Sequence, residues 1–199
     1  MELQHINVKL FVKHEDEVDP EALVPVFHHW IQSQGPGELL LDVADYRHVR
    51  WGPGVVLIGH DGNYSLDHTD GRWGIRYNRK TPLEGSNLDR LVQATQAALE
   101  ACRRLESESS LNGSVQFNGR EIEWFINDRL LAPNTPETRL QAEPEFAAFF
   151  STLLGDSEYS LSYPQDPRRL FTVQLTTRQT LGAGTLLENL RSFAPLPCF

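Results

Sequence analysis

Short segments in which apolar and polar side chains alternate constrain the fold of this chain most strongly. The first, INVKLFV at residues 6–12, places four apolar side chains on one side: Ile6, Val8, Leu10 and Val12. A period of two is the spacing at which side chains share one face of a β-strand. The alternation recurs in NYSLD and RWGIRYN, on either side of the turn-forming pair Asp70-Gly71. The chain is therefore predicted to contain half-buried strands, mainly paired antiparallel.

The stretch from residue 52 to residue 80, GPGVVLIGHDGNYSLDHTDGRWGIRYNRK, has two interpretations. It can form the floor of a ligand site, or it can consist of turns with ordinary strands between them. Pairing Asp67 with Arg72 places Leu66 beside Trp73 on an apolar face and leaves a charge-matched polar ladder on the other face. Because that ladder needs no ligand to explain it, the stretch is predicted to be strands and turns.

Six further segments are predicted to be extended. The run LLLDV at residues 39–43 is typical of a strand buried on both faces, and VVLIG at residues 55–59 of a central strand. The pair Asn118-Gly119 favours a two-residue turn and predicts a hairpin between VQF and REIEWFI. A second hairpin is predicted where YSLSY and LFTVQL flank the turn-rich PQDPRR.

Helical spacing is clearest over residues 87–106. Ser86 and Asp89 approximate a capping box before an apolar stripe that only Thr95 interrupts. Thr135 is the expected N-cap of another helix that reaches about Leu154, and TLLENL predicts a short last helix.

An earlier helix is predicted after Asp19-Pro20, with a bend or a late start at Pro25. Together these elements predict an α+β fold, with a mainly antiparallel sheet and helices packed on one face. The order strand, helix, strands, helix recurs loosely, which suggests two similar halves. Residues 1–199 are predicted to be a single domain, with a candidate subdomain boundary near residues 107–113.

Composition and net charge limit the classes of molecule that the chain is expected to bind. The chain has 199 residues, a formal net charge of −9 and 40% hydrophobic residues, values expected of a globular protein. The negative charge disfavours nucleic-acid backbones and anionic lipid surfaces. Without an apolar run long enough to cross a bilayer or a signal peptide, a cytoplasmic location is expected.

The basic residues around RYNRK stand out in an acidic chain. Arg76, Arg79 and Lys80 can hold a carboxylate or a phosphate. The alternative is that they pair with Glu84, Asp89 or the acidic loop at residues 15–19. With the polar residues around them they give the candidate ligand site: His60, Asn63, Tyr64, Arg76, Asn78, Arg79 and Lys80.

Other chemistry has weaker support. A set of imidazoles and carboxylates suited to zinc or iron is present: His60, Asp61, Asp67, His68 and Asp70. Because a predicted strand separates the two histidines, these residues are predicted to be solvated loop positions, and neither a metal nor a cofactor is expected. Trp51 and Phe199 are the aromatic residues expected to be exposed, and both are candidate contacts for a protein partner or a second copy.

Several segments, among them VPVFHHWIQ, LLLDVADYRHV, GPGVVLIGHDGNYSLD and NDRLLAPNTPET, together resemble a group of uncharacterised bacterial proteins. The resemblance implies a bacterial, cytosolic setting and no particular activity, cofactor or catalytic residue.

Two hypotheses for the function follow. In the first, the chain is a non-catalytic binding or assembly module that contacts a protein partner or a small anionic ligand. In the second, it is a small-molecule enzyme in which His60 is the acid or base and Arg76, Arg79 and Lys80 clamp an anion.

Overall fold

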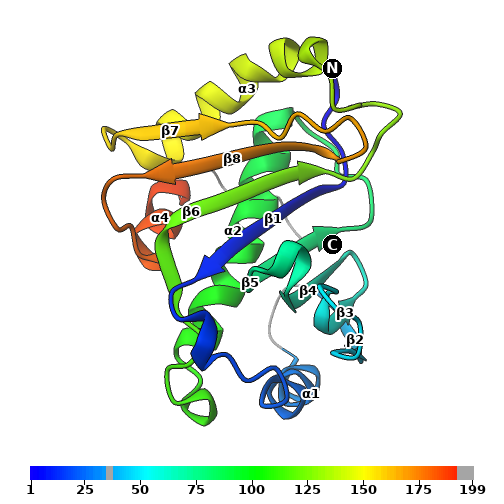
Figure 1. The fold of residues 1–199 in the computed structure, drawn as a ribbon, viewed down its shortest axis with the longest axis vertical. Helices are drawn as coiled ribbons and strands as arrows, with labels where there is room; N and C mark the ends of the chain where they lie inside the picture. Colours follow the sequence, from blue (N-terminus) through cyan, green and yellow to red (C-terminus); the bar gives the residue numbers. More distant parts are fainter. Residues whose placement is uncertain (35–37, 192–199) are drawn as a thin grey trace.

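A computed structural model describes residues 1–34 and 38–191 and places eight strands in one antiparallel sheet (Figure 1). The order across the sheet is β2-β3-β4-β5-β1-β6-β8-β7. The strands are β1 (Ile6–Val12), β2 (Leu40–Tyr46), β3 (Gly54–Gly59), β4 (Gly62–Asp67), β5 (Gly74–Arg79), β6 (Phe117–Ile126), β7 (Tyr159–Ser162) and β8 (Phe171–Thr177).

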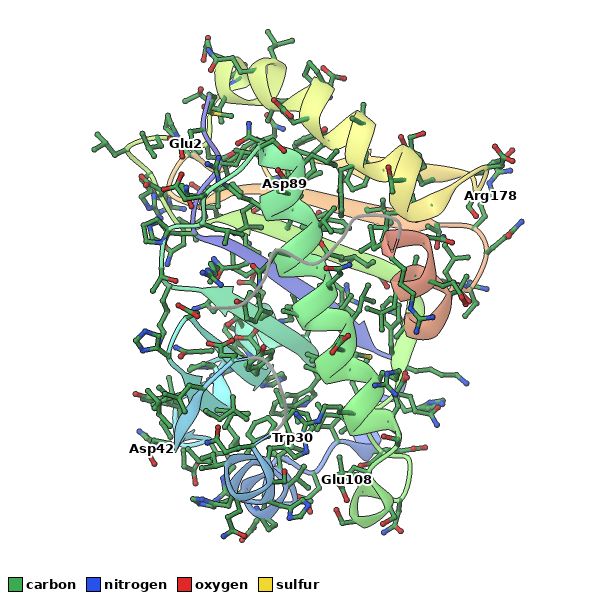
Figure 2. All side chains as sticks on the ribbon, turned by 180° about the vertical axis from the view of Figure 1, so that it is seen from behind. Glu2, Trp30, Asp42, Asp89, Glu108 and Arg178 are labelled. Atoms are coloured by element: carbon green, nitrogen blue, oxygen red, sulfur yellow. The ribbon has the colours of Figure 1, made fainter. Side chains whose placement is uncertain are left out.

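Four α-helices pack against this sheet, as predicted for an α+β fold. They are α1 (Leu23–Ser33), α2 (Asn87–Glu106), α3 (Pro136–Leu154) and α4 (Ala183–Leu190). Helix α2 crosses behind β1 and β5 in Figure 1, and α3 and α4 pack against it on the same side. Figure 2 shows this helix side, where Trp30 of α1 lies near the end of α2 and contacts Arg104. The predicted arrangement of helices on one face is therefore confirmed.

The predicted N-terminal caps of α2 and α3 are confirmed. Ser86 and Asp89 form a reciprocal capping box at the start of α2, and Thr135 caps α3 through the amide of Thr138. Thr95, the polar interruption of the α2 stripe, is buried and accepts a hydrogen bond of 2.8 Å from the indole of Trp124. A polar residue thus fits the core because it has a partner there.

The two halves of the chain contribute strands to opposite sides of the same sheet and meet where β1 pairs with β6. The central strands β1 and β6 pair antiparallel; β5 and β4 follow outward from β1, and β8 and β7 follow outward from β6. Each half therefore runs strand, helix, hairpin, helix, and the first half adds β2 and β3 outside β4. One sheet runs through both halves.

The predicted hairpin at Asn118-Gly119 is wrong. Both residues lie within β6, where a bulge sets residues 118–121 opposite Phe11 alone, between the pairs Leu10–Ile122 and Val12–Phe117. Gly119 has a φ of 71°, which suits a bulge as well as a turn. The pair Asn118-Gly119 does mark a residue with a positive φ, but the strand continues through it without reversing.

Two predictions about β2 and β4 need correction. The run at residues 39–43 is not buried on both faces, because β2 is an edge strand that pairs only with β3 and leaves Leu41 exposed. In the hairpin of β4 and β5, Asp67 lies opposite Gly74, not Arg72, so that Leu66 faces Ile75. A shift of two residues keeps every side chain on its predicted face.

Candidate functional site

The sheet face opposite the helices carries a polar network at its centre. Lys9 of β1 and Asp67 of β4 form an ion pair with 2.7 Å between Nζ and Oδ1. Arg76 of β5 donates to Asp67 Oδ2 and to Asn78 Oδ1, each over 3.2 Å, and its guanidinium lies 4.5 Å from the ring centroid of Phe125. The positive charges in this network thus have internal partners.

Three of the predicted ligand residues belong to this face. Asn63 of β4 lies opposite Asn78 of β5, and Asn78 lies opposite Asn7 of β1, so three side-chain amides form one row across neighbouring strands. Arg76 is two positions from Asn78 and shares its face.

The other four predicted residues lie elsewhere. Tyr64 points to the helix side, where its ring packs 5.0 Å from that of Tyr77 and its hydroxyl donates to Glu38 over 3.1 Å. His60 is exposed in the turn between β3 and β4. The structure does not bring the seven residues into one site.

Arg79 and Lys80 are engaged by their own surroundings. Arg79 Nε donates to the carbonyl of Thr81 over 3.0 Å, and its guanidinium lies 3.9 Å from Asp61. Lys80 donates to the carbonyl of Gly59. The alternative of internal pairing therefore describes these side chains, but with Asp61 and backbone carbonyls as the partners in place of Glu84 and Asp89.

Glu38 is a titratable group that sequence analysis did not consider, and its pKa is shifted. Burial raises the pKa of its carboxyl group, and this effect exceeds the opposing hydrogen bonds from the amide of Gly62 and the hydroxyl of Tyr64. Burial also raises the pKa of Tyr77 to about 12, helped by the nearby charge of Glu38.

The histidines considered as metal ligands have other surroundings. His68 stacks on Trp73 with ring centroids 4.2 Å apart. Asp67 is a fully buried residue of β4 that pairs with Lys9, so the prediction that it is a solvated loop position was wrong. Among residues 1–34 and 38–191, no group of three or more histidine, cysteine, aspartate or glutamate side chains is placed to hold a metal ion.

Trp51 is exposed, as predicted, with 54% of its surface accessible. It lies in the loop between β2 and β3, and the guanidinium of Arg50 lies 4.5 Å from its ring centroid. Phe199 lies outside the described residues.

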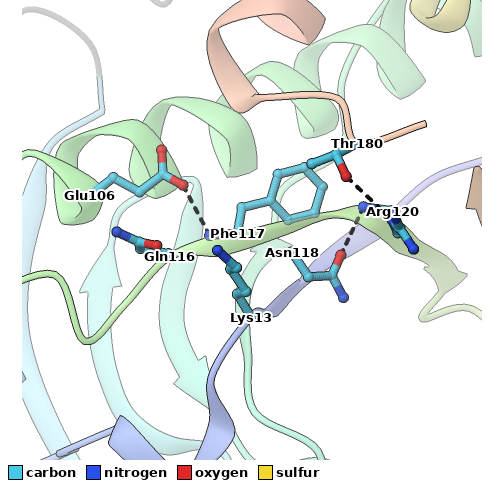
Figure 3. A pocket seen from close by; sticks show the side chains of 7 residues that line it. All are labelled: Lys13, Glu106, Gln116, Phe117, Asn118, Arg120 and Thr180. Carbon is cyan, nitrogen blue, oxygen red and sulfur yellow. Dashed lines mark hydrogen bonds between the residues drawn. The ribbon is translucent and has the colours of Figure 1, made fainter.

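A pocket of about 620 Å³ opens beside the bulge of β6 (Figure 3). It is lined by Lys13, Glu106, Gln116, Phe117, Asn118, Arg120 and Thr180. These residues come from the end of β1, the end of α2, the start of β6 and the connection from β8 to α4. The volume lies within the range of small-molecule sites.

The bulge gives this pocket its shape. The Asn118 side chain accepts hydrogen bonds from the amides of Arg120 and Glu121, over 2.8 and 3.0 Å. The carbonyl of Gly119 accepts a hydrogen bond from the amide of Leu181 over 2.7 Å, which ties the β8–α4 connection to the bulge. The bulge thus holds the β8–α4 connection beside β6 through this hydrogen bond.

Two cations line the pocket. The guanidinium of Arg120 donates to the hydroxyl of Thr180 over 3.3 Å and has no carboxylate partner within the described chain. The ammonium of Lys13 has no hydrogen bond or ion pair with any described residue. The carboxylate of Glu106 accepts a hydrogen bond of 2.9 Å from the amide of Phe117 (Figure 3). The lining thus carries one more positive than negative charge.

Sequence analysis missed this pocket entirely. The one local indication was the pair Asn118-Gly119. It predicted an irregular backbone at this position, but we interpreted it as a hairpin turn and not as a bulge. Lys13 and Thr180 are far apart in the chain, and nothing in the sequence indicates that they share a pocket.

Comparisons with known proteins add no relative: no protein-family model, curated protein or solved structure matches the chain. Over the described ranges, no helix has both the length and the apolar character needed to cross a membrane.

Proposed function

We propose that the chain is a non-catalytic binding module that holds a small anionic ligand in the pocket beside the β6 bulge. The observation that supports this proposal is the pair of cations Lys13 and Arg120, which line the pocket and have no carboxylate partner among the described residues. Arg76 and Arg79, the arginines favoured from the sequence, already face Asp67 and Asp61.

The pocket suits an anion for electrostatic reasons. Lysine and arginine donate charge-assisted hydrogen bonds to carboxylate and phosphate oxygens, and the guanidinium can donate two in parallel. Gln116 and Asn118 add amide groups that can orient a ligand. Glu106 opposes an anion, but one of its oxygens is occupied by the amide of Phe117.

The charge of the whole chain limits the kind of anion. A net charge of −9 repels extended polyanions at long range, whereas two local cations can still hold a small one. A small metabolite with carboxylate or phosphate groups is therefore preferred to a nucleic acid, and a cytoplasmic setting agrees with such a ligand.

Isothermal titration calorimetry with citrate and inorganic phosphate tests the proposal. We expect one of the two to bind, and Lys13→Gln and Arg120→Gln each to weaken binding about tenfold, as loss of one charge-assisted hydrogen bond predicts. Arg168→Gln is the matched control, because it removes an exposed positive charge paired with Asp166 in the connection between β7 and β8.

Two results would overturn the proposal. One is that neither anion binds the wild-type chain. The other is that all three variants bind equally, which would mean that the anion lies elsewhere.

A further inference from the structure

Unpaired polar atoms gather at one place in the sheet. Within residues 1–34 and 38–191, four buried side-chain atoms lack a hydrogen-bond partner: Asn7 Nδ2, Asn7 Oδ1, Asn63 Oδ1 and Arg76 Nε. They belong to three adjacent strands, β1, β4 and β5, and lie on the face opposite the helices. Their common location points to one cause rather than three unrelated defects.

Asn7 supplies two of these four unpaired atoms and lies at one end of the row Asn63–Asn78–Asn7. Its side chain is fully buried, and neither end of its amide has a partner. A buried amide without a protein partner destabilises the folded chain unless another group forms its hydrogen bonds. An apolar residue at this position would avoid that cost.

Arg76 covers Asn7. The two register neighbours of Asn7 are Asn78 on β5 and Phe125 on β6. The guanidinium of Arg76 donates to Asn78 and lies 4.5 Å from the ring of Phe125, so it spans the position between them. The side chain of Arg76 is 20% exposed whereas Asn7 is fully buried, from which we infer that Arg76 forms part of the layer over Asn7.

The attachment of Arg76 is weak for a charged group. Both of its side-chain hydrogen bonds, to Asp67 and Asn78, are 3.2 Å long, whereas charge-assisted bonds from guanidinium to carboxylate are usually shorter. Rotation of this long side chain toward solvent would uncover Asn7 while its Nε remained near the site.

The unpaired atoms define a complementary group. Asn7 Nδ2 and Arg76 Nε are donors, and Asn7 Oδ1 and Asn63 Oδ1 are acceptors. A primary carboxamide offers one oxygen that accepts two hydrogen bonds and one NH₂ group that donates two. It can pair with the amide of Asn7 through two bonds and use the remaining capacity for Arg76 and Asn63.

The charges nearby favour an uncharged ligand. Lys9 and Arg76 are balanced by Asp67 and by Glu123, which lies opposite Lys9 on β6. A carboxylate ligand would lack donors for the two asparagine oxygens and would lie near these carboxylates.

We propose that Asn7, Asn63 and Arg76 form a second binding site, which takes a primary carboxamide when Arg76 moves aside. The carboxamide comes either from a small free amide or from a glutamine or asparagine side chain of a peptide. The site is separate from the anion pocket and does not depend on it.

Nuclear magnetic resonance of side-chain amides tests this site in the full chain. The NH₂ signals of Asn7, assigned by their loss in Asn7→Leu, are followed during addition of benzamide, N-acetylglutamine N-methylamide, and the isosteric acids benzoate and N-acetylglutamate N-methylamide, which contain no primary carboxamide. We expect one or both amides to shift these signals and to raise the melting temperature, and the acids to do neither. Benzamide and the glutamine derivative separate the two sources of the carboxamide.

Variants complete the test. Asn7→Leu is expected to abolish the thermal response, and Asn63→Leu to weaken amide binding about fivefold, as loss of one neutral hydrogen bond predicts; Asn63→Leu serves if Asn7→Leu does not fold. Asn189→Leu removes an amide that is bonded to Leu153 on the helix side and is expected to keep the response. Signals that no amide shifts, signals that the acids shift equally, or a long-lived water bound to Asn7 would overturn the proposal.

Discussion

Lys9 and Asp67, which lie 58 positions apart in the chain, form an ion pair that is almost completely buried. Their charged atoms are 2.7 Å apart, and their side chains are 4% and 0% exposed. Lys9 also donates to the carbonyls of Thr69 and Arg72, while Asp67 accepts from Thr69 and Arg76. Burial alone would raise the pKa of Asp67, but the charges of Lys9 and Arg76 outweigh it and lower that pKa. The ammonium of Lys9 and both carboxylate oxygens of Asp67 therefore have hydrogen-bond partners.

Loss of one partner from this pair is expected to be costly. Lys9→Met should lower the free energy of unfolding by about 3 to 5 kcal/mol, because it leaves the buried charge of Asp67 with fewer partners. Lys9→Met combined with Asp67→Leu should recover part of that loss, since both charges are then absent. Urea unfolding of the three proteins measures the effect, and a single variant as stable as the wild type would contradict it.

Local patterns predicted the elements well. The alternation in β1, the capping box of α2 and the N-cap of α3 each depend on residues within a few positions of one another. The prediction that β1 is half-buried was wrong, because the residues on both of its faces are buried. The face of each residue in β4 and β5 was also predicted correctly although the register was not, because a shift of two preserves the alternation.

Pairing between distant segments could not be predicted in the same way. The sequence placed Lys9 on the polar side of β1, but nothing local indicates that β5 lies between β1 and β4 and that Lys9 reaches Asp67. The apolar run of β2 gave no indication that its strand would lie at an edge. The bulge uses the positive φ of Gly119, which a tight turn at Asn118-Gly119 would also need, so the glycine alone does not separate the two structures.

Gly119 is predicted to be required for the bulge. An alanine there would place its Cβ 2.5 Å from Thr180 Cγ2 and would hold a φ of 71°, which costs about 1 to 2 kcal/mol for a residue with a side chain. Gly119→Ala should therefore lower the midpoint of urea unfolding. Gly184→Ala is the control: it lies in helix α4 with nothing within 4 Å of the added Cβ, and it should be neutral or stabilising. Equal effects of the two substitutions would contradict this role of Gly119.

Glu38 is predicted to make stability depend on pH. Because burial raises its pKa above the ordinary value of 4.5, the folded carboxyl keeps its proton at pH values where the unfolded one has lost it. Stability supplied by the protonated group is present below pH 4.5 and is lost as the pH rises through the folded pKa. Glu38→Gln does not titrate, so its stability relative to the wild type should increase as the pH rises above 4.5.

Urea unfolding between pH 4 and pH 8 measures this difference. Glu17→Gln, at an exposed position, is expected to show no such trend. If the stability of Glu38→Gln relative to the wild type falls with rising pH, the pKa of Glu38 is lowered and not raised by folding.

Thr95 is predicted to stabilise the core through the indole of Trp124. The two side chains are fully buried, and Trp124 Nε1 donates to Thr95 Oγ1 over 2.8 Å. Thr95→Val preserves the shape but leaves the indole N–H without a partner, which should cost about 1 to 3 kcal/mol. Trp124→Phe also loses packing against Phe149 and Phe150, so it should cost more. In the double variant, no N–H remains to be left unpaired, and the combined loss should be smaller than the sum of the single losses. Additive losses in urea unfolding would mean that this hydrogen bond contributes little to stability.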